Sequence, residues 1–171
     1  MRKNAKDVAF LGLCTALALI LAYVEVLLPP LFPAVPGIKM GLPNIIIIFL
    51  LYRCGVRAAV MVSLVRMLLV TLLFGNAMAL MYSLAGAVLS LAMMILLRRL
   101  NVLSTVGVSV AGAVMHNAGQ ILMAMLLLET AELAYYLVVL TITGTIAGVF
   151  IGLCGAVMIR KLPEGTLKFR K

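Results

Sequence analysis

Apolar residues fall along this chain in long continuous runs, which short polar or basic segments separate. Continuous runs predict helices that cross a membrane, whereas a membrane β-barrel requires alternating apolar and polar positions. About 20 apolar residues span a bilayer as a helix. We therefore expect an all-α, polytopic membrane protein: a bundle of six transmembrane helices that forms a single domain over residues 1–171. The predicted helices cover approximately residues 8–28, 44–52, 58–74, 77–97, 102–128 and 134–159.

The second run is much shorter than the others. Residues Asn44–Tyr52 make only about 14 Å of helix. This helix either extends back through Gly41–Pro43 or spans only part of the bilayer. The outer loop before it, residues 29–43, is long, apolar and rich in proline and glycine. We expect this loop to be either a lid over a cavity that opens outward or a plain connector at the membrane surface.

The composition narrows the class of protein. Hydrophobic residues make up 65% of the chain and charged residues 11%. Soluble domains contain about 45–50% apolar residues and about 25% charged residues. This difference excludes a soluble enzyme, a disordered tail and a secreted disulfide scaffold. The chain is expected to be embedded in the lipid bilayer along most of its length.

The positions of the charges predict the topology. The net charge is +9, from 14 Lys and Arg against 5 Asp and Glu. Most basic residues lie at alternate ends of successive apolar runs, and such ends are normally cytoplasmic. We therefore expect both termini on the cytoplasmic side and no nucleic-acid partner, because the basic residues orient the chain. These residues are Arg2, Lys3, Lys6, Arg53, Arg57, Arg98, Arg99, Arg160, Lys161, Lys168, Arg170 and Lys171.

Four polar residues are expected at bilayer depth. Arg66 lies in the middle of the third run. A charge at this depth costs at least about 2.5–3.5 kcal/mol, so the side chain should face the bundle interior or a wet cavity. His116, Asn117 and Gln120 lie in the middle of the fifth run, at spacings of three and four residues that place them on one helix face. These residues are the strongest candidates for a binding site.

Two further polar residues lie nearer the outer surface, Glu25 in the first run and Asn44 at the start of the second. One hypothesis is that Glu25 neutralises Arg66 in a structural ion pair, since their expected depths differ by only about 7 Å. The other is that Arg66 and the fifth-run residues line a polar cavity for an anionic or amide-bearing solute. The two hypotheses overlap because an ion pair can also line a site. A hydrogen-bonded packing role for His116 is a further interpretation.

The chain offers little for catalysis. It contains one Asp, Asp7, and one His. It has neither a glycine-rich phosphate loop nor a C-x-x-C motif, so we expect no ATP hydrolysis, no covalent haem and no bound cofactor. Three cysteines, Cys14, Cys54 and Cys154, are expected at similar depths near the cytoplasmic side. They are either small apolar filler or ligands of an iron–sulfur cluster shared across a dimer.

Small residues mark the faces along which the helices pack. Membrane helices pack through small residues because apolar area gains little against lipid tails. The sixth run repeats Gly144, Gly148 and Gly152, and the first carries Gly12 and Ala16. These faces serve either packing within the chain or, in the first run, docking of a partner membrane protein. The fourth run carries a similar set, namely Ser83, Gly86, Ala87 and Ser90.

Four segments, in their order and spacing, resemble a known family. They read PGIKMGLPNI, LVRMLLVTLLFG, YSLAGAVLSLAMM and GVSVAGAVMHNAGQ. Over about residues 7–160 they resemble the Gx transporter family, also labelled heptaprenyl diphosphate synthase component I. That family is similar to the substrate-binding S components of energy-coupling-factor (ECF) transporters.

The resemblance implies a bacterial cell-membrane protein with six helices and both termini inside. It implies capture of a small-molecule solute from outside, with uptake driven by a separate transmembrane coupling subunit and ATPases. It also implies that the first-helix face with Gly12 and Ala16 docks that subunit. The residues at family-typical positions are Lys39 and Asn44 within 37–44, Arg66, Ser83, His116, Asn117 and Gln120.

Two other functions are consistent with this resemblance. Family members occur beside flavin-linked electron-transfer proteins in Gram-positive bacteria, which with the three cysteines suggests a membrane subunit of a flavin- or quinone-linked electron-transfer system. The family label suggests a partner of a prenyl diphosphate synthase. That partner would be non-catalytic, because such synthases hold Mg²⁺ with Asp-rich clusters and this chain has a single Asp.

Overall fold

The computed structural model describes residues 5–27, 41–74 and 77–162, and in these ranges the chain is an all-α bundle without strands. Five helices are long and apolar enough to cross a membrane, and the other one is shorter. The predicted fold class, a multi-pass helical membrane bundle, is confirmed. The elements are α1 (Ala5–Leu27), α2 (Asn44–Arg53), α3 (Val56–Phe74), α4 (Ala77–Leu100), α5 (Thr105–Leu128), the 3-10 helix η1 (Ala131–Tyr135) and α6 (Tyr136–Lys161).

Two helices start later than the apolar pattern predicted. Helix α5 begins at Thr105 instead of Val102 because Ser104 caps it: the Ser104 hydroxyl accepts a hydrogen bond from the Gly107 amide, 3.3 Å away. Helix α6 begins at Tyr136 because the residues before it form the separate turn η1. Apolar content alone does not fix a helix end, since capping and turn residues decide it.

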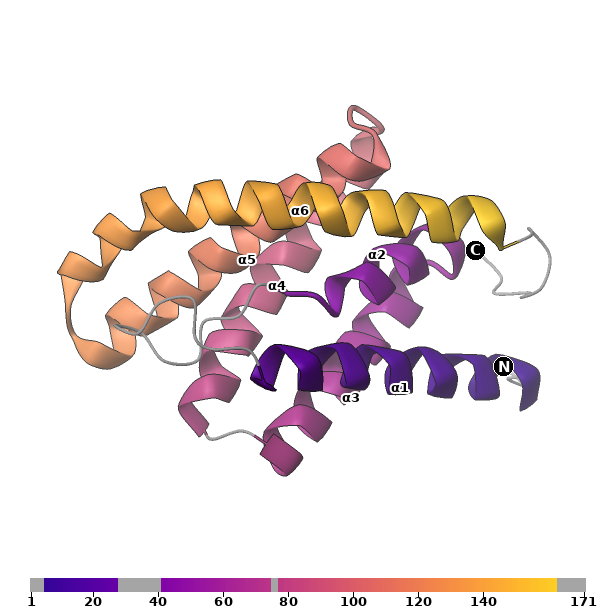
Figure 1. Cartoon of the computed structure of the whole chain (residues 1–171), viewed down its shortest axis with the longest axis horizontal. Helices are drawn as coiled ribbons and strands as arrows, with labels where there is room; N and C mark the ends of the chain where they lie inside the picture. Colours follow the sequence, from indigo (N-terminus) through magenta and orange to yellow (C-terminus); the bar gives the residue numbers. More distant parts are fainter. Residues whose placement is uncertain (1–4, 28–40, 75–76, 163–171) are drawn as a thin grey trace.

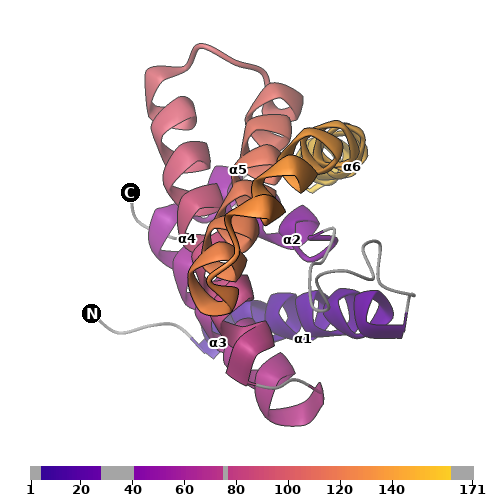
Figure 2. The ribbon, with the colours of Figure 1, turned by 90° about the vertical axis from the view of Figure 1, so that its left-hand side faces the viewer.

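Helices α1 and α6 lie along opposite sides of the molecule, with α2 between them (Figure 1). Helix α5 packs against α4 on one side and against α6 on the other (Figure 2). The first turn of α1 and the last turn of α6 lie at the same end (Figure 1). This arrangement is what a chain with both termini on one side of the membrane requires.

The short helix α2 forms the centre of the core. Every residue from Ile46 to Leu51 is at most 3% exposed, because α1, α3 and α6 all pack against this helix. A helix that is apolar on every side is stable only when it is surrounded. Of the two predictions for this segment, a partial span holds: α2 starts at Asn44, and its ten residues do not cross a bilayer.

Glycines allow α6 to approach α5 closely. A Cβ atom at Gly148 would lie 2.7 Å from the Cα atom of Val110, and one at Gly152 would lie 2.8 Å from the Cα atom of Val106. The repeated glycines of α6 therefore serve packing within the chain, as predicted. Gly12 of α1 differs, because it is exposed and no atom lies within 4 Å of its would-be Cβ position.

Candidate functional site

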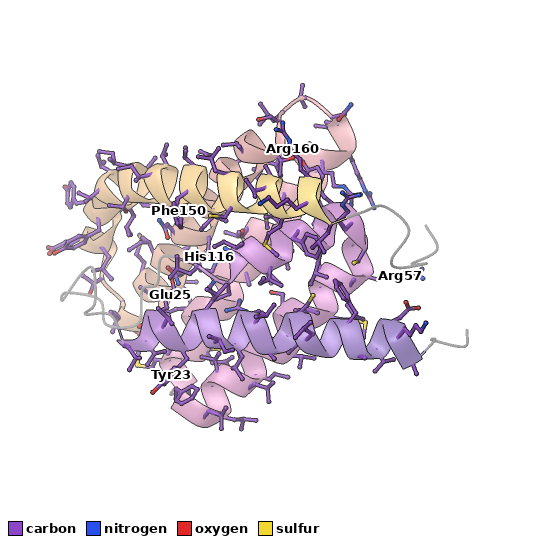
Figure 3. All side chains as sticks on the ribbon, turned by 45° about the vertical axis from the view of Figure 1, so that its right-hand side comes forward. Tyr23, Glu25, Arg57, His116, Phe150 and Arg160 are labelled. Atoms are coloured by element: carbon purple, nitrogen blue, oxygen red, sulfur yellow. The ribbon has the colours of Figure 1, made fainter. Side chains whose placement is uncertain are left out.

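Polar residues from four helices and from the chain just before α2 meet inside the bundle. A Cβ atom at Gly41 would lie 2.9 Å from Asn44 Nδ2 and 3.7 Å from His116 Cδ2. Glu25 on α1 and His116 on α5 both lie in the interior, between the ribbons of α1 and α6 (Figure 3). We call this group the central polar cluster; it consists of Glu25, Gly41, Asn44, Arg66, His116 and Gln120.

Glu25 holds the start of α2 against α1. Its Oε1 atom accepts hydrogen bonds from the backbone amides of Gly41 and of Leu42, the latter at 3.2 Å. Gly41 has φ of +84°, a conformation that favours glycine. The Glu25 side chain is 8% exposed, so these bonds form away from solvent. Glu25 therefore has a defined structural role.

We expect Glu25→Leu to lower the stability of the chain by about 2–3 kcal/mol, because one buried amide and one partly buried amide lose their acceptor. Glu25→Gln should cost less, since the amide oxygen of glutamine still accepts hydrogen bonds. Thermal unfolding of the detergent-purified chain, followed by circular dichroism, measures both effects. Equal stability of the leucine and glutamine variants would contradict this role.

Arg66 is buried without a hydrogen-bond partner for its Nε atom among the described residues. The side chain is 9% exposed, although it lies in the middle of a helix long enough to span the membrane. No salt bridge joins it to Glu25 within the described ranges, although the two charges are close enough to interact. Within the described residues, the structural ion pair that we considered is therefore not formed as a salt bridge, and the Nε–H group of Arg66 has no acceptor.

Gln120 also has unpaired polar atoms: in the part of the chain that the structure describes, both of its amide atoms have no hydrogen-bond partner. The His116 ring lies against the backbone of Gly86, with which it interacts, although its Nδ1 atom makes no hydrogen bond of standard geometry. Gln120 is fully buried and His116 is 5% exposed. Burying an amide without a hydrogen bond costs roughly 1–3 kcal/mol. This cost is unusual for a group that serves packing alone.

Close packing of α4 against α5 fixes the position of these two side chains. A Cβ atom at Gly86 would lie 2.8 Å from the carbonyl oxygen of His116 and 3.0 Å from Gln120 Cγ. A Cβ atom at Gly119 would lie 2.6 Å from the carbonyl oxygen of Ala85. The two glycines let the backbones meet and leave His116 and Gln120 little freedom to rotate away.

Asn117 belongs to a different contact. Its Nδ2 atom donates a 2.8 Å hydrogen bond to the carbonyl oxygen of Leu140, on α6. Gly144 makes room for it, since a Cβ atom there would lie 2.6 Å from Asn117 Nδ2. The single polar face expected for α5 is therefore divided: His116 and Gln120 pack beside α4, whereas Asn117 joins α5 to α6.

The other site residues predicted from the sequence make fewer contacts with the central polar cluster. Asn44 lies beside Gly41 at the first turn of α2 and is half-buried. Ser83 is half-buried on α4, and the described residues give it no hydrogen bond. Lys39 and most of the 29–43 loop lie outside the described residues, so the lid prediction remains a prediction.

Ser90 was not among the predicted site residues. Its hydroxyl is 1% exposed and has no hydrogen-bond partner within the described ranges. It lies one turn of α4 from Gly86, and a Cβ atom at Gly112 would lie 3.3 Å from its Oγ atom. From the sequence, Ser90 was identified only as a small packing residue. Its spacing of four residues from Gly86 was the feature that could have indicated its place on the face of α4 that packs against α5.

The cysteines do not form a metal-ligand set. Cys14 is buried, Cys54 and Cys154 are half-buried, and all three are free. Among the described residues, no three His, Cys, Asp or Glu side chains are grouped as metal ligands. In the turn after α2, burial and, to a lesser extent, the nearby Asp7 charge raise the pKa of the Cys54 thiol to about 11. Cys54 is therefore protonated at neutral pH and is a poor nucleophile.

Comparison with known proteins gives one family. The model of a family described as heptaprenyl diphosphate synthase component I matches residues 14–158. No curated protein and no solved structure matches the chain. The matched range includes α2 to α5 whole and every residue of the central polar cluster.

Proposed function

We propose that this chain, which belongs to the heptaprenyl diphosphate synthase component I family, is a multi-pass, substrate-binding membrane subunit similar to an ECF transporter S component. The family model spans most of the chain. The subunit captures a small solute at the outer face of the bacterial cytoplasmic membrane and catalyses no reaction. A separate transmembrane coupling subunit with ATPases drives uptake.

One observation carries this proposal: buried polar atoms on α3 and α5 lack partners within the described chain, and they belong to one cluster. These atoms are Arg66 Nε and the amide atoms of Gln120. Buried polar groups in proteins are almost always hydrogen-bonded, and ionisable groups at membrane depth usually mark a substrate pathway. A hydrophilic solute between the helices supplies the missing partners.

Mass spectrometry of small molecules released from the purified full-length chain tests this function. We expect one polar compound in a near-equimolar amount to the protein, absent from an unrelated membrane protein purified in the same way. Release of no compound, together with no stabilisation of the chain by any small-molecule extract of its host, would refute solute binding.

The exposed face of α1 fits the docking of a coupling subunit. Gly12 and Ala16 are both exposed, with Leu13 and Leu17 beside them at 58% and 41% exposure. Small residues let a second helix approach closely in a membrane. The neighbouring leucines then add contact area on the same side of the helix.

We expect Gly12→Leu to fold and bind solute normally but to lose the coupling subunit. The space around Gly12 is open within the chain, so the new side chain obstructs only a partner. Co-purification of the host's coupling subunit and ATPases with the tagged chain measures the association. Thr145→Leu, on the exposed side of α6, is the matched control. Retention of the partners by Gly12→Leu would show that docking takes place elsewhere.

The family description supports a second candidate, a non-catalytic partner of a prenyl diphosphate synthase. The single Asp of the chain, Asp7, cannot form the Asp-rich magnesium site of such an enzyme. The same co-purification separates the candidates: recovery of a soluble prenyl synthase without ATPases supports the second. Recovery of a coupling subunit with ATPases supports the first.

A further inference from the structure

We propose that the connection between α4 and α5 binds anionic phospholipids in the membrane leaflet at that end of the bundle. Arg98 and Arg99 bind the phosphate group of the lipid, and the apolar side chains that follow them lie among its acyl chains. This inference concerns the surface of the chain and is independent of solute capture.

The connection projects from the side of the bundle. Helices α4 and α5 extend together beyond α6, and the connection between them stands at the top of both views (Figures 1 and 2). Every residue from Leu100 to Ser104 is exposed, and the large apolar side chains among them are exposed by 61% at Leu100, 67% at Val102 and 46% at Leu103. Three neighbouring apolar side chains are costly in water, so they require lipid or a protein partner around them.

Hydrogen bonds at both ends fix this connection. The Asn101 amide donates to the carbonyl oxygen of Leu97 at 3.1 Å, and Asn101 ends α4 with φ of +53°. Ser104 caps the start of α5. Only Val102 and Leu103 lie between these two helix ends, which hold their side chains at the surface.

The two arginines require an anion from outside the chain. A guanidinium group is always charged and has five N–H donors but no acceptor. No Asp or Glu occurs in α2, α3, α4, α5 or α6. Neither Arg98 nor Arg99 donates a hydrogen bond to another residue in the part of the chain that the structure describes. Their charges are therefore not neutralised by the helices that surround them.

Tyr52 of α2 holds one of these arginines in place. The Arg98 Cζ atom lies 5.3 Å from the centroid of the Tyr52 ring. This contact uses the face of the guanidinium and leaves the N–H groups at its edge to donate. Arg99 is exposed beside it. Two guanidinium groups at one helix end match the oxygens of a phosphate, which arginine binds through paired hydrogen bonds.

A phospholipid matches the whole surface better than other anions do. Its phosphate and its acyl chains are adjacent in one molecule, as the arginines and the apolar side chains are adjacent here. Free phosphate would satisfy the arginines alone. Helix ends rich in Arg and Lys are normally cytoplasmic, and the cytoplasmic leaflet carries the anionic lipids.

An introduced tryptophan tests this proposal, because the chain contains none of its own. Val102→Trp is reconstituted into phosphatidylcholine bilayers with increasing fractions of phosphatidylglycerol or phosphatidylcholine that carry bromine on their acyl chains. Bromine quenches tryptophan fluorescence on contact. We expect both lipids to quench Val102→Trp, and brominated phosphatidylglycerol to do so at lower fractions. Leu72→Trp, at an 81% exposed position in the last turn of α3, is the control and should be quenched equally by both.

Removal of both arginines should abolish the preference. In the Val102→Trp chain, Arg98→Gln with Arg99→Gln should lower the association constant of phosphatidylglycerol relative to phosphatidylcholine by about tenfold or more, since each arginine near an anionic surface contributes about fivefold. Arg57→Gln with Arg160→Gln removes two exposed charges from α3 and α6 and should leave the preference in place. If the first double variant does not fold, Arg99→Gln alone should lower the relative association constant by about fivefold.

Three results would overturn the proposal. The first is equal quenching of Val102→Trp by the two brominated lipids, and the second is a preference that survives the loss of the arginines. The third is fluorescence typical of tryptophan in water, with no quenching by either lipid, which would indicate that the connection is open to a soluble partner. Recovery of a co-purified solute tests the proposed function separately, and its outcome does not depend on these results.

Discussion

Replacing Arg66 by methionine should leave the chain unable to bind its solute and should also lower its stability. Arg66 is a buried charge whose Nε atom has no hydrogen-bond partner in the described chain. Glu25 is buried as well, and its charge interacts with that of Arg66. Removing one of two interacting buried charges leaves the other uncompensated. We therefore expect binding to be lost and stability to fall by about 1–3 kcal/mol.

Thermal unfolding and recovery of the co-purified solute measure the two effects on the same preparation. Arg66→Lys is the control: it keeps a cation but loses the planar fork, so binding should weaken while stability stays near that of the wild-type chain. Undiminished recovery of the solute from Arg66→Met would show that the guanidinium does not hold it. That result would remove the main argument for a solute between the helices.

Replacing Gly148 by leucine should destabilise the bundle by about 3 kcal/mol or more, the largest structural effect that we expect. The first side-chain carbon would lie 2.7 Å from the Cα atom of Val110. A flexible side chain could move away, but Val110 Cα is backbone within α5. Relief therefore requires α5 and α6 to separate along their whole contact.

Gly12→Leu is the matched control for this substitution. It adds the same side chain to another membrane helix, at a position where no atom lies within 4 Å of the added carbon. Its unfolding temperature should remain at the wild-type value, whereas Gly148→Leu should unfold earlier or fail to assemble in detergent. Similar unfolding temperatures for the two variants would show that α5 and α6 are not held in close contact.

The two sides of α5 differ in whether their polar groups are paired. The α5–α6 contact has its polar group satisfied, since Asn117 donates to Leu140 and glycines remove the obstruction. On the α4 side, Gln120 and Ser90 have no partners within the described residues. The stable contact with α6 thus anchors α5 while its other side presents unpaired groups.

The sequence predicted the fold closely because hydrocarbon imposes a simple rule. Every backbone polar group in lipid must be satisfied within its own helix, so long apolar runs become helices. Helices α3 and α4 start or end within a few residues of the predicted bounds, and α2 is short as the run predicted. The errors lie at Ser104 and at η1, where a cap and a turn override the apolar pattern.

The sequence predicted which polar residues lie inside the bundle, but not which contacts each of them makes. A charged or amide side chain at bilayer depth is costly wherever it points, which identifies Arg66, His116, Asn117 and Gln120 from their positions in the sequence. Spacing along α5 could not distinguish Asn117, which bonds to α6, from Gln120, which has no partner in the described chain. Nor could it assign Glu25 to the amides before α2.

By itself, then, the sequence determined that the chain spans a membrane, which runs form its helices and which polar residues lie at depth. These properties follow from the transfer of individual residues between water and hydrocarbon, and each residue contributes independently of its neighbours in space. Only the tertiary structure decided which polar atoms are paired and which remain unpaired. Pairing depends on the distance between atoms of different helices, and that distance is set by glycine contacts such as those of Gly86 and Gly144.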